Sequence, residues 1–415
     1  MIIIHNTSQV IPLTANPQRG SALGTLNAIE HGAVAIEDGK IIEVGAAAVL
    51  LERYPQAEKL DAQGGAVLPG FVDPHTHLVW AGNRAAEFEM RLQGKTYMEI
   101  MAAGGGIAST VSETRRVSLD ELIAQSHQRA LAAFGHGSTT IEAKTGYGLD
   151  LDTEFKQLEA ILEMNRLGPY ELVPTYMGAH AIPTEFKGDT AGFVDFLVET
   201  ALPEVKNWWL VKAEGQALPF VDVFCEQGVF DIDQTRRILC EARELGFALK
   251  LHADEFVNLG GAALAAELGA TSADHLVKTS LDDIRAMADS ETVAVSLPGT
   301  PFSLAQSEYT PAKQIIAADG YLALATDLNP GTTWNESMQM IQALACRYMK
   351  LTPAQALSAA TINSAKAVSR EAQIGSLTSG KQADLLILST PDYRDLSYRY
   401  GANLVRTVIK RGQVW

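Results

Sequence analysis

Cysteine is scarce in this chain, and long apolar runs are missing. The three cysteines, Cys225, Cys240 and Cys346, are odd in number, and their spacing fits neither a disulfide framework nor a CxxC metal site. We therefore expect reduced thiols in a cytoplasmic protein. No run of about 18 apolar residues occurs, which excludes a membrane-spanning helix. Residues 1–5 have no basic segment before their short apolar run, so a signal peptide is not expected.

Basic residues are too few for a chain that binds nucleic acid. Lys and Arg number 33 against 49 Asp and Glu, which gives a net charge of −16. Binding to phosphates requires a basic face, so we expect neither nucleic acid nor an anionic membrane surface as the main partner. The 415 residues exceed one typical compact core and suit a barrel with a smaller second domain.

The two ends of the chain share a pattern of short strands. Near the N-terminus, two β-rich runs at 33–37 and 40–44 flank Asp38-Gly39, a dipeptide typical of a tight hairpin turn. Near the C-terminus, the runs at 384–388 and 405–410 have the same texture. Neither end could bury a sheet face alone. The pattern therefore predicts that both ends pair into one small composite β-sandwich.

The middle of the chain alternates strands with helices, which is typical of parallel βα units. One helix is expected to begin at Asp152 as its cap and to stop at Gly168 and Pro169. Eight such units over about 300 residues favour a closed (β/α)₈ TIM-type barrel. An open doubly wound sheet is the alternative, but no GxGxxG follows a strand. The predicted strands lie at 70–77, 138–144, 172–180, 221–225, 247–252, 272–276, 292–297 and 322–327.

These patterns divide the chain into two predicted domains. Residues 67–366 form the barrel. Residues 1–66 and 367–415 form the two parts of the β-sandwich.

A histidine pair ends the first predicted strand of the barrel. In such a barrel the active site lies at the carboxyl ends of the strands. Strand side chains alternate between two faces, so His75 and His77 are expected to point the same way, as two ligands of one metal ion would. For the HxH pair alone, two hydrogen-bonded structural imidazoles are the better interpretation.

Further metal-binding and titratable side chains end other predicted strands. The fifth strand ends at His252, and Glu255 follows three residues later. The sixth strand carries His275, and the eighth ends at Asp327. Convergence at four correct strand ends by chance is improbable, so the whole set favours a metal-dependent hydrolytic site over a structural cluster.

On these residues the chain resembles the amidohydrolase superfamily over the barrel and both flanks. The matching segments are 71–77, 250–255, 272–275 and Asp327. Other segments resemble the members that open the cyclic amide of 4-imidazolone-5-propanoate in histidine degradation and release N-formimino-L-glutamate. These segments are 80–84, 104–107, 144–149, 178–181 and 327–332. Among them, the loop Gly104–Gly106 is expected to be a flexible lid.

The resemblance implies a mononuclear metal site with one Zn or Fe ion per chain. The fourth strand, 221–225, has no lysine at its end that could bridge two metals, which favours a single ion. Lys144 and Lys250 lie on other strands and are expected to form an ion pair with Glu142 inside the barrel. The implied metal ligands are His75, His77, His252 and Asp327.

The resemblance also implies how the catalytic residues divide the proton transfers. A metal lowers the pKa of its water to about 7. Asp327 and His275 are suited to take or hold the proton of that water. Glu255 would protonate or position the leaving ring nitrogen, and His180, at the third strand end, would donate to the developing oxyanion. For His180 alone, a structural imidazole is an equal alternative.

A propionate tail on the substrate requires a cation. Arg84 has the planar fork that suits a carboxylate, although a surface arginine is the alternative interpretation. Tyr147 would add a hydroxyl, and the segment after Asp327 would meet the polar end of the substrate. The expected substrate contacts are Arg84, Tyr147, His180, Glu255, Asn329, Gly331 and Thr332.

Two other functions remain open from the sequence. A nucleobase deaminase of the same superfamily would use the same metal and proton-transfer residues. Arg84 and His180 argue against it, because a neutral ring needs no carboxylate clamp. A non-catalytic scaffold would have lost metal ligands, and this chain keeps them. We expect a small anionic substrate as the partner, no nucleic acid, no membrane, and a homodimer as a candidate assembly.

Overall fold

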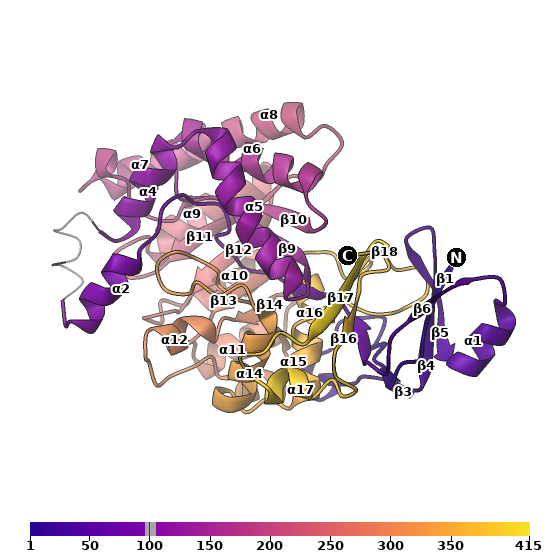
Figure 1. The fold of residues 1–415 in the computed structure, drawn as a ribbon. Coiled ribbons are helices and arrows are strands. Elements are labelled where there is room, and N and C mark those ends of the chain that lie inside the picture. Colours follow the sequence, from indigo (N-terminus) through magenta and orange to yellow (C-terminus); the bar gives the residue numbers. More distant parts are fainter. Residues whose placement is uncertain (96–98, 100–104) are drawn as a thin grey trace.

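The computed structural model describes residues 1–95, 99 and 105–415, and it consists of a barrel with a β-sheet domain at its side (Figure 1). Gly104 of the expected glycine-rich lid lies outside the described residues. Within the described part, eight parallel strands follow one another in the order β15-β14-β13-β12-β11-β10-β9-β8. They are β8 (Phe71–Asp73), β9 (Ser138–Lys144), β10 (Glu171–Ala179), β11 (Phe220–Cys225), β12 (Ala248–Ala253), β13 (Ser272–His275), β14 (Val293–Ser296) and β15 (Tyr321–Leu324).

The predicted (β/α)₈ barrel is confirmed, and its last seam closes beyond the regular strands. Between β8 and β15 the chain forms an isolated parallel bridge from Thr76 to Leu328. The amide of Asp327 donates to the carbonyl of His75 at 3.1 Å, and the amide of His77 donates to Leu328 at 2.9 Å. The seam of the barrel therefore brings the histidine pair and Asp327 together.

Two predicted strands end three or more residues earlier than expected, and this corrects their bounds. The first strand stops at Asp73, because Pro74 has no N–H to continue the ladder. The eighth stops at Leu324, and Asp327 follows with φ of 56°, in the left-handed region. The histidines and Asp327 thus lie in segments just past the strands. The bridge at Thr76 keeps the first of these segments extended, so the two histidines still face the same site.

Helices cover the outside of the barrel (Figure 1). The chain between the first and second strands contributes α5, and the chain from the second to the fourth strand contributes α6, α7 and α8, with a π-helical stretch at Leu197–Ala201. The described helices are α2 (Ala85–Leu92), α4 (Ile107–Arg116), α5 (Leu119–Gly135), α6 (Leu151–Leu167), α7 (Thr190–Phe196), α8 (Leu202–Lys212), α9 (Ile232–Glu244), α10 (Gly261–Leu268), α11 (Leu281–Ala288), α12 (Gly299–Ser303), α13 (Ala312–Ala317), α14 (Met338–Tyr348), α15 (Pro353–Ala359) and α16 (Ile362–Lys366).

Helix α6 corrects one predicted start. Its N-cap is Asp150, whose side chain accepts the N–H of Thr153 at 2.8 Å, and the expected cap Asp152 lies within the first turn. The extended backbone of Asp150 allows this bond, whereas a residue already in the helix cannot make it. The end at Leu167, with Gly168 as the C-cap, is as predicted. The helix runs from the carboxyl ends of the strands to their amino ends, because it joins β9 to β10.

Both termini build the β-domain, as the sequence predicts. The strands β4 and β5 form a hairpin in which Glu37 pairs with Lys40 across Asp38-Gly39. C-terminal β16 pairs antiparallel with N-terminal β7, which joins the two ends in one sheet. Figure 1 shows both chain ends in this domain. The elements are β1 (Ile2–His5), β2 (Gln9–Val10), β3 (Ile29–Glu30), β4 (Gly32–Glu37), β5 (Lys40–Ala46), α1 (Ala47–Arg53), β6 (Glu58–Asp61), β7 (Val67–Pro69), β16 (Leu385–Leu388), α17 (Asp395–Tyr398), β17 (Val405–Lys410) and β18 (Gln413–Val414), with short 3₁₀ turns elsewhere at Gly20–Ala22 and Thr184–Phe186.

The two sheets of the β-domain share one apolar core. The sheets have the orders β5-β4-β1-β6 and β18-β17-β16-β7-β2-β3. Ile4 and Ile36 of the first sheet are buried with Leu385 and Ile409 of the second. This packing is that of a sandwich. The domain boundaries at residues 66 and 366 stay a prediction.

No helix in the described ranges is both long and apolar enough to cross a bilayer.

Candidate active site

The carboxyl ends of the barrel strands surround a cavity of about 620 Å³, which we call the carboxyl-end cavity. Every predicted site residue except His75 lines it, and His75 is fully buried below. The predicted residues in its lining are His77, Arg84, Tyr147, His180, His252, Glu255, His275, Asp327, Asn329, Gly331 and Thr332.

Three imidazoles and one carboxylate converge at the floor of this cavity. Nε2 of His75 lies 3.6 Å from Oδ1 of Asp327, and Nε2 of His77 lies 3.7 Å from the same oxygen. Nε2 of His252 approaches Nε2 of His77 at 3.3 Å. The donor atoms of His75, His77 and Asp327 all fall within 4.8 Å of one another. This convergence is the one predicted from the strand ends.

Carboxylates behind two of the imidazoles fix the ring orientation. Nδ1 of His75 donates to Asp274 at 2.6 Å, and Nδ1 of His252 lies 3.1 Å from Oδ1 of Asp222. A carboxylate on one ring nitrogen turns the other ring nitrogen, as a free lone pair, toward a metal. Asp222 was not among the predicted site residues. Its place on strand β11, pointing into the barrel, was the available signal.

The electrostatics of the cluster suit metal ligation. Burial lowers the pKa of His75 and His77 well below the ordinary imidazole value, and neighbouring imidazoles and Lys144 act in the same direction. Both rings are therefore neutral, which is the form that ligates a metal. Nε2 of His75 is buried without a hydrogen-bond partner among the described residues. A buried polar atom without a partner is costly, and a cation beside Asp327 would satisfy it. The residues present therefore fit a metal ion.

The expected ion pair inside the barrel is confirmed. Lys144 lies 2.7 Å from Glu142 and 2.6 Å from Asp222, and Lys250 lies 3.7 Å from Glu142. All four side chains are fully buried. Burial alone would lower the pKa of Lys144, but Asp222 and Glu142 outweigh it and raise that pKa above its usual range. A charged Lys144 in turn anchors Asp222 behind His252.

A buried acid lies on the other side of the imidazoles. Oε2 of Glu255 lies 3.7 Å from Nε2 of His275. Burial raises the pKa of Glu255 well above the ordinary carboxyl value, and the charges of Asp327 and Glu226 add to this effect. The carboxylate of Glu226, missed by the sequence analysis, accepts the N–H of Phe256 at 2.9 Å. It therefore holds the turn that carries Glu255. Its place directly after β11 was the signal.

His180 and Tyr147 form one wall of the cavity. The ring of His180 stacks on His77 with centroids 4.8 Å apart, and its Nδ1 lies 2.9 Å from the carbonyl of Gly146. A carbonyl only accepts, so Nδ1 carries the proton. Burial lowers the pKa of His180 to about 3, so the ring is neutral and its Nε2 is an acceptor. Tyr147 is buried beside it, with centroids 5.2 Å apart.

Arg84 lies at the rim of the same cavity. Its Nε donates to Glu87 at 2.9 Å, and its side chain is only 17% exposed, which does not fit the interpretation as a surface arginine. A Cβ at Gly331 would lie 2.5 Å from Nη1 of Arg84, so a larger residue there would displace the guanidinium. Arg91, missed by the sequence analysis, donates to the carbonyl of Gly331 at 3.2 Å.

The segment after Asp327 is internally bonded. Oδ1 of Asn329 accepts the N–H groups of Gly331 and Thr332, each at 2.8 Å, and its Nδ2 donates to the hydroxyl of Thr332 at 2.9 Å. These three residues are among the predicted substrate contacts. In the structure they bond to one another, and they set the shape of the rim beside Arg84.

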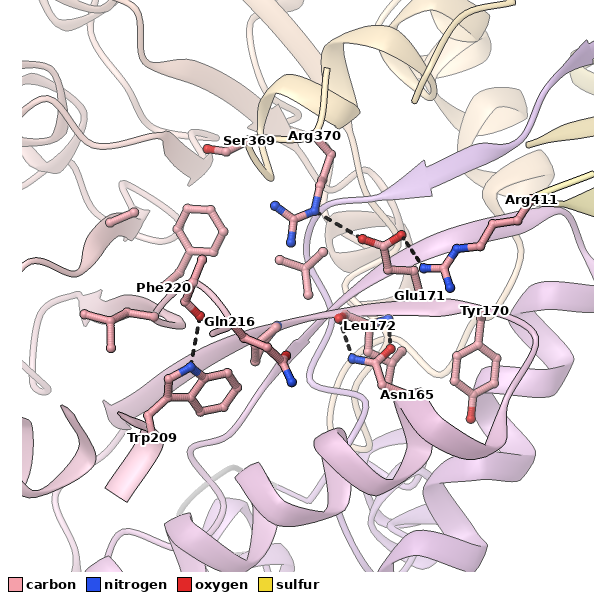
Figure 2. Close-up of a pocket in the computed structure, with 15 residues that line it drawn as sticks. Asn165, Tyr170, Glu171, Leu172, Trp209, Gln216, Phe220, Ser369, Arg370 and Arg411 are labelled. Carbon is pink, nitrogen blue, oxygen red and sulfur yellow. Dashed lines mark hydrogen bonds and ion pairs between the residues drawn. The ribbon is translucent and has the colours of Figure 1, made fainter. Parts of the chain in front are cut away.

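A second cavity, of about 430 Å³, opens at the amino ends of the strands, and we call it the amino-end cavity (Figure 2). Several of its polar side chains already have protein partners. Glu171 lies 3.1 Å from Nε of Arg370 and 3.4 Å from Arg411. Asn165 exchanges two hydrogen bonds with the backbone of Leu172, and the Trp209 indole donates to a carbonyl. None of the predicted site residues lines it.

A parallel barrel with neutral imidazoles and a carboxylate converging at the carboxyl ends of its strands defines the class of metal-dependent hydrolases. Comparison with known proteins agrees with this class. The amidohydrolase family profile matches residues 66–415, and the profile of an imidazolonepropionase-like composite domain from bacteria matches residues 32–57.

Similar proteins narrow the class to one family. The imidazolonepropionase of Herpetosiphon aurantiacus is 50% identical over 99% of this chain and 96% of its own length. That of Chloroflexus aggregans is 46% identical over 100% and 98%. A zinc-bound adenosine deaminase from Xanthomonas campestris has the same fold, with a TM-score of 0.71 at 19% identity over 100% of this chain and 92% of that one. The chain belongs to the amidohydrolase family and, within it, to the imidazolonepropionases.

Proposed function

We propose that this chain hydrolyses the cyclic amide C–N bond of 4-imidazolone-5-propanoate to N-formimino-L-glutamate, a step of histidine degradation. One observation carries the proposal. A single cavity joins the imidazole–carboxylate cluster to the guanidinium of Arg84, so it can hold a hydrolysable ring and a carboxylate tail together. The names of the relatives support the same substrate.

We propose that one Zn or Fe ion binds per chain. The absence of a lysine at the end of β11 supports a single ion. A bound ion of this kind supplies Lewis-acid activation of water and of the amide carbonyl. The proposed ligands are His75, His77, His252 and Asp327.

The proton transfers fall to the chain's own carboxylates and imidazoles. Asp327 is suited to take the proton of the attacking water, because burial raises its pKa to about 6 and Thr300 holds its Oδ2 at 2.5 Å. His275 is suited to hold the same proton after the attack, and its Nε2 lies 3.7 Å from Glu255. Glu255 is buried, and its raised pKa favours the protonated form, so it is suited to donate a proton to the ring nitrogen as the C–N bond breaks.

The remaining cavity groups would orient the substrate. The guanidinium of Arg84 binds the propionate, with Glu87 holding its Nε side. Nε2 of His180 accepts a hydrogen bond from the ring N–H, because its Nδ1 proton is committed to Gly146. This revises the donor role expected from the sequence. The hydroxyl of Tyr147 donates to the substrate. Asn329 holds Gly331 and Thr332 at the rim next to Arg84.

We also propose a cytoplasmic homodimer that acts on this small anionic substrate. Sedimentation velocity of the purified protein tests the assembly, and a monomer would contradict it.

An ultraviolet assay of the purified enzyme tests the function. We expect turnover of 4-imidazolone-5-propanoate and none of cytosine or guanine. Turnover of a nucleobase without turnover of the imidazolone would refute the proposal and favour a deaminase.

A further inference from the structure

A buried carboxylate outside the carboxyl-end cavity holds one wall of it. Glu154, on α6, is 2% exposed. Its carboxylate accepts the backbone N–H of Gly146 at 3.1 Å, of Gly148 at 2.8 Å and of Leu149 at 2.9 Å. Three backbone donors on one carboxylate fix the path of residues 145–149, which we call the Tyr147 segment. Glu154 itself does not line the cavity.

The Tyr147 segment needs such a partner. Gly146 has φ of 103° and Leu149 has φ of 57°, so the backbone twice enters the left-handed region, once at a residue with a branched side chain. A residue other than glycine, here Leu149, persists in this region only where its surroundings hold it. The N–H groups at both of these positions are among those that Glu154 accepts.

Two cavity groups depend on this segment. Tyr147 is part of it, and the carbonyl of Gly146 receives the Nδ1 proton of His180. That bond selects the tautomer of His180 and therefore leaves Nε2 as the acceptor that faces the cavity. A chain of contacts thus runs from Glu154 through the backbone to both side chains.

We propose that Glu154 is a positioning residue for the hydrolytic reaction, acting through the Tyr147 segment on Tyr147 and His180. The inference rests on the proposed function, because it assigns both side chains to substrate binding. Glu154 touches no substrate.

The other end of the same helix offers a matched control. Asn165, also on α6, exchanges two hydrogen bonds with the backbone of Leu172, at 2.8 and 2.6 Å. Asn165 fixes a backbone segment beside the amino-end cavity, and Glu154 fixes one beside the carboxyl-end cavity. Asn165→Leu removes a side chain that binds backbone, far from the proposed chemistry.

The test compares Glu154→Gln with Asn165→Leu in the metal-loaded enzyme. The remaining oxygen of Gln can still accept the N–H groups of Gly148 and Leu149, but its NH₂ group replaces the oxygen that lies 3.1 Å from the N–H of Gly146. Gly146 then keeps only the 3.2 Å bond to the other oxygen, so the segment loosens at Gly146. We expect both variants to lose thermal stability. Only Glu154→Gln should lower kcat/KM, by about tenfold or more, with metal content unchanged. The double variant Glu154→Gln/Tyr147→Phe should lose less activity than the product of the two single losses, because both substitutions act on the same segment.

A second variant approaches the same contact from the loop. A Cβ at Gly148 would lie 2.8 Å from the Glu154 carboxylate, from the Glu154 backbone N and from Cβ of Thr153, so Gly148→Ala should push the segment away from α6 and lower kcat/KM in the same manner. The proposal is overturned if Glu154→Gln stays within twofold of wild type, or if its loss multiplies with that of Tyr147→Phe. Failure of both variants to fold, with Asn165→Leu folded, would also overturn it in favour of a purely structural role. A wild type without turnover would instead refute the proposed function.

Discussion

The two ends of the barrel each carry a cavity with charged and polar side chains, and only the carboxyl-end cavity has the features of an active site. In the amino-end cavity, Glu171 forms an ion pair with Arg370, and Asn165 forms hydrogen bonds with the backbone of Leu172 (Figure 2). In the carboxyl-end cavity, Nε2 of His75 has no partner within the described residues, and two Nε2 atoms approach to 3.3 Å. Polar groups that converge without satisfying one another distinguish the carboxyl-end cavity.

The difference shows why polarity or size alone does not identify a site. A satisfied ion pair already has its best partner and gains little from a ligand. A buried imidazole nitrogen without a hydrogen-bond partner raises the free energy of the folded state, and a bound cation would remove this cost. Stability therefore resides at the amino end of the barrel, and chemistry at its carboxyl end, as the barrel fold arranges in general. Substitutions at the two ends test this difference, because those at the carboxyl end should lower activity and those at the amino end should lower stability.

The largest expected effect is that of Asp327→Asn. The amide is a poor metal ligand and a poor proton acceptor, so we expect kcat to fall by roughly 10³-fold or more. Elemental analysis should find about one Zn or Fe per chain in the wild type and less in the variant. Chelation of the wild type should abolish turnover, and added metal should restore it. Two metals per chain, or full activity without metal, would contradict the proposed site.

Glu255→Gln and His275→Asn come next in size. Neither residue is a proposed ligand, so both variants should keep their metal and lose roughly 10²-fold in kcat, as proton-transfer groups do. Metal content measured beside kcat separates the two roles. A variant that loses metal would show that its residue is a ligand and that the assignment is wrong.

Much of this arrangement could be predicted from the sequence, because strand ends are marked by local residues. Strand β9 has its predicted bounds, and Asp38-Gly39 forms its predicted turn. His75, His77 and Asp327 meet as expected. The meeting of these three side chains needed only the rule that parallel strands present their carboxyl ends together.

The rest depends on contacts that no local pattern records. The sequence gives no sign of which N–H groups the carboxylates of Glu226 and Glu154 accept, because these bonds form only once the loops pack. The contact of the Asn329 amide with substrate stays a prediction, and the sequence does not show that this amide also bonds to its own loop. The cap of α6 was misplaced by two residues because Asp150 and Asp152 are equally good caps until the backbone is known.

Arg84→Met is expected to have a smaller effect than loss of an acid. Loss of the charge-assisted bonds to the propionate should cost about 2 kcal/mol, or roughly 30-fold in kcat/KM. Arg84→Lys keeps the charge without the planar fork and should lose less. The wild type should discriminate against an amidated propionate far more than Arg84→Met does. Equal discrimination by the two enzymes would mean that Arg84 does not read the carboxylate.

Glu171→Gln, at the amino end, should change activity least of all. Burial alone would raise the pKa of Glu171, but Lys410 and Arg370 outweigh it and lower that pKa below the ordinary value. The stabilisation is therefore fully present above the ordinary glutamate pKa of about 4.3 and is lost as pH falls through the lowered value. We expect kcat/KM within twofold of wild type, and a free energy of unfolding lower by about 1 kcal/mol at pH 7. Denaturant titrations at pH 7 and below pH 4 should show this difference shrinking with acid. A large loss of turnover would instead bring the amino-end cavity into the function and remove the distinction between the two ends.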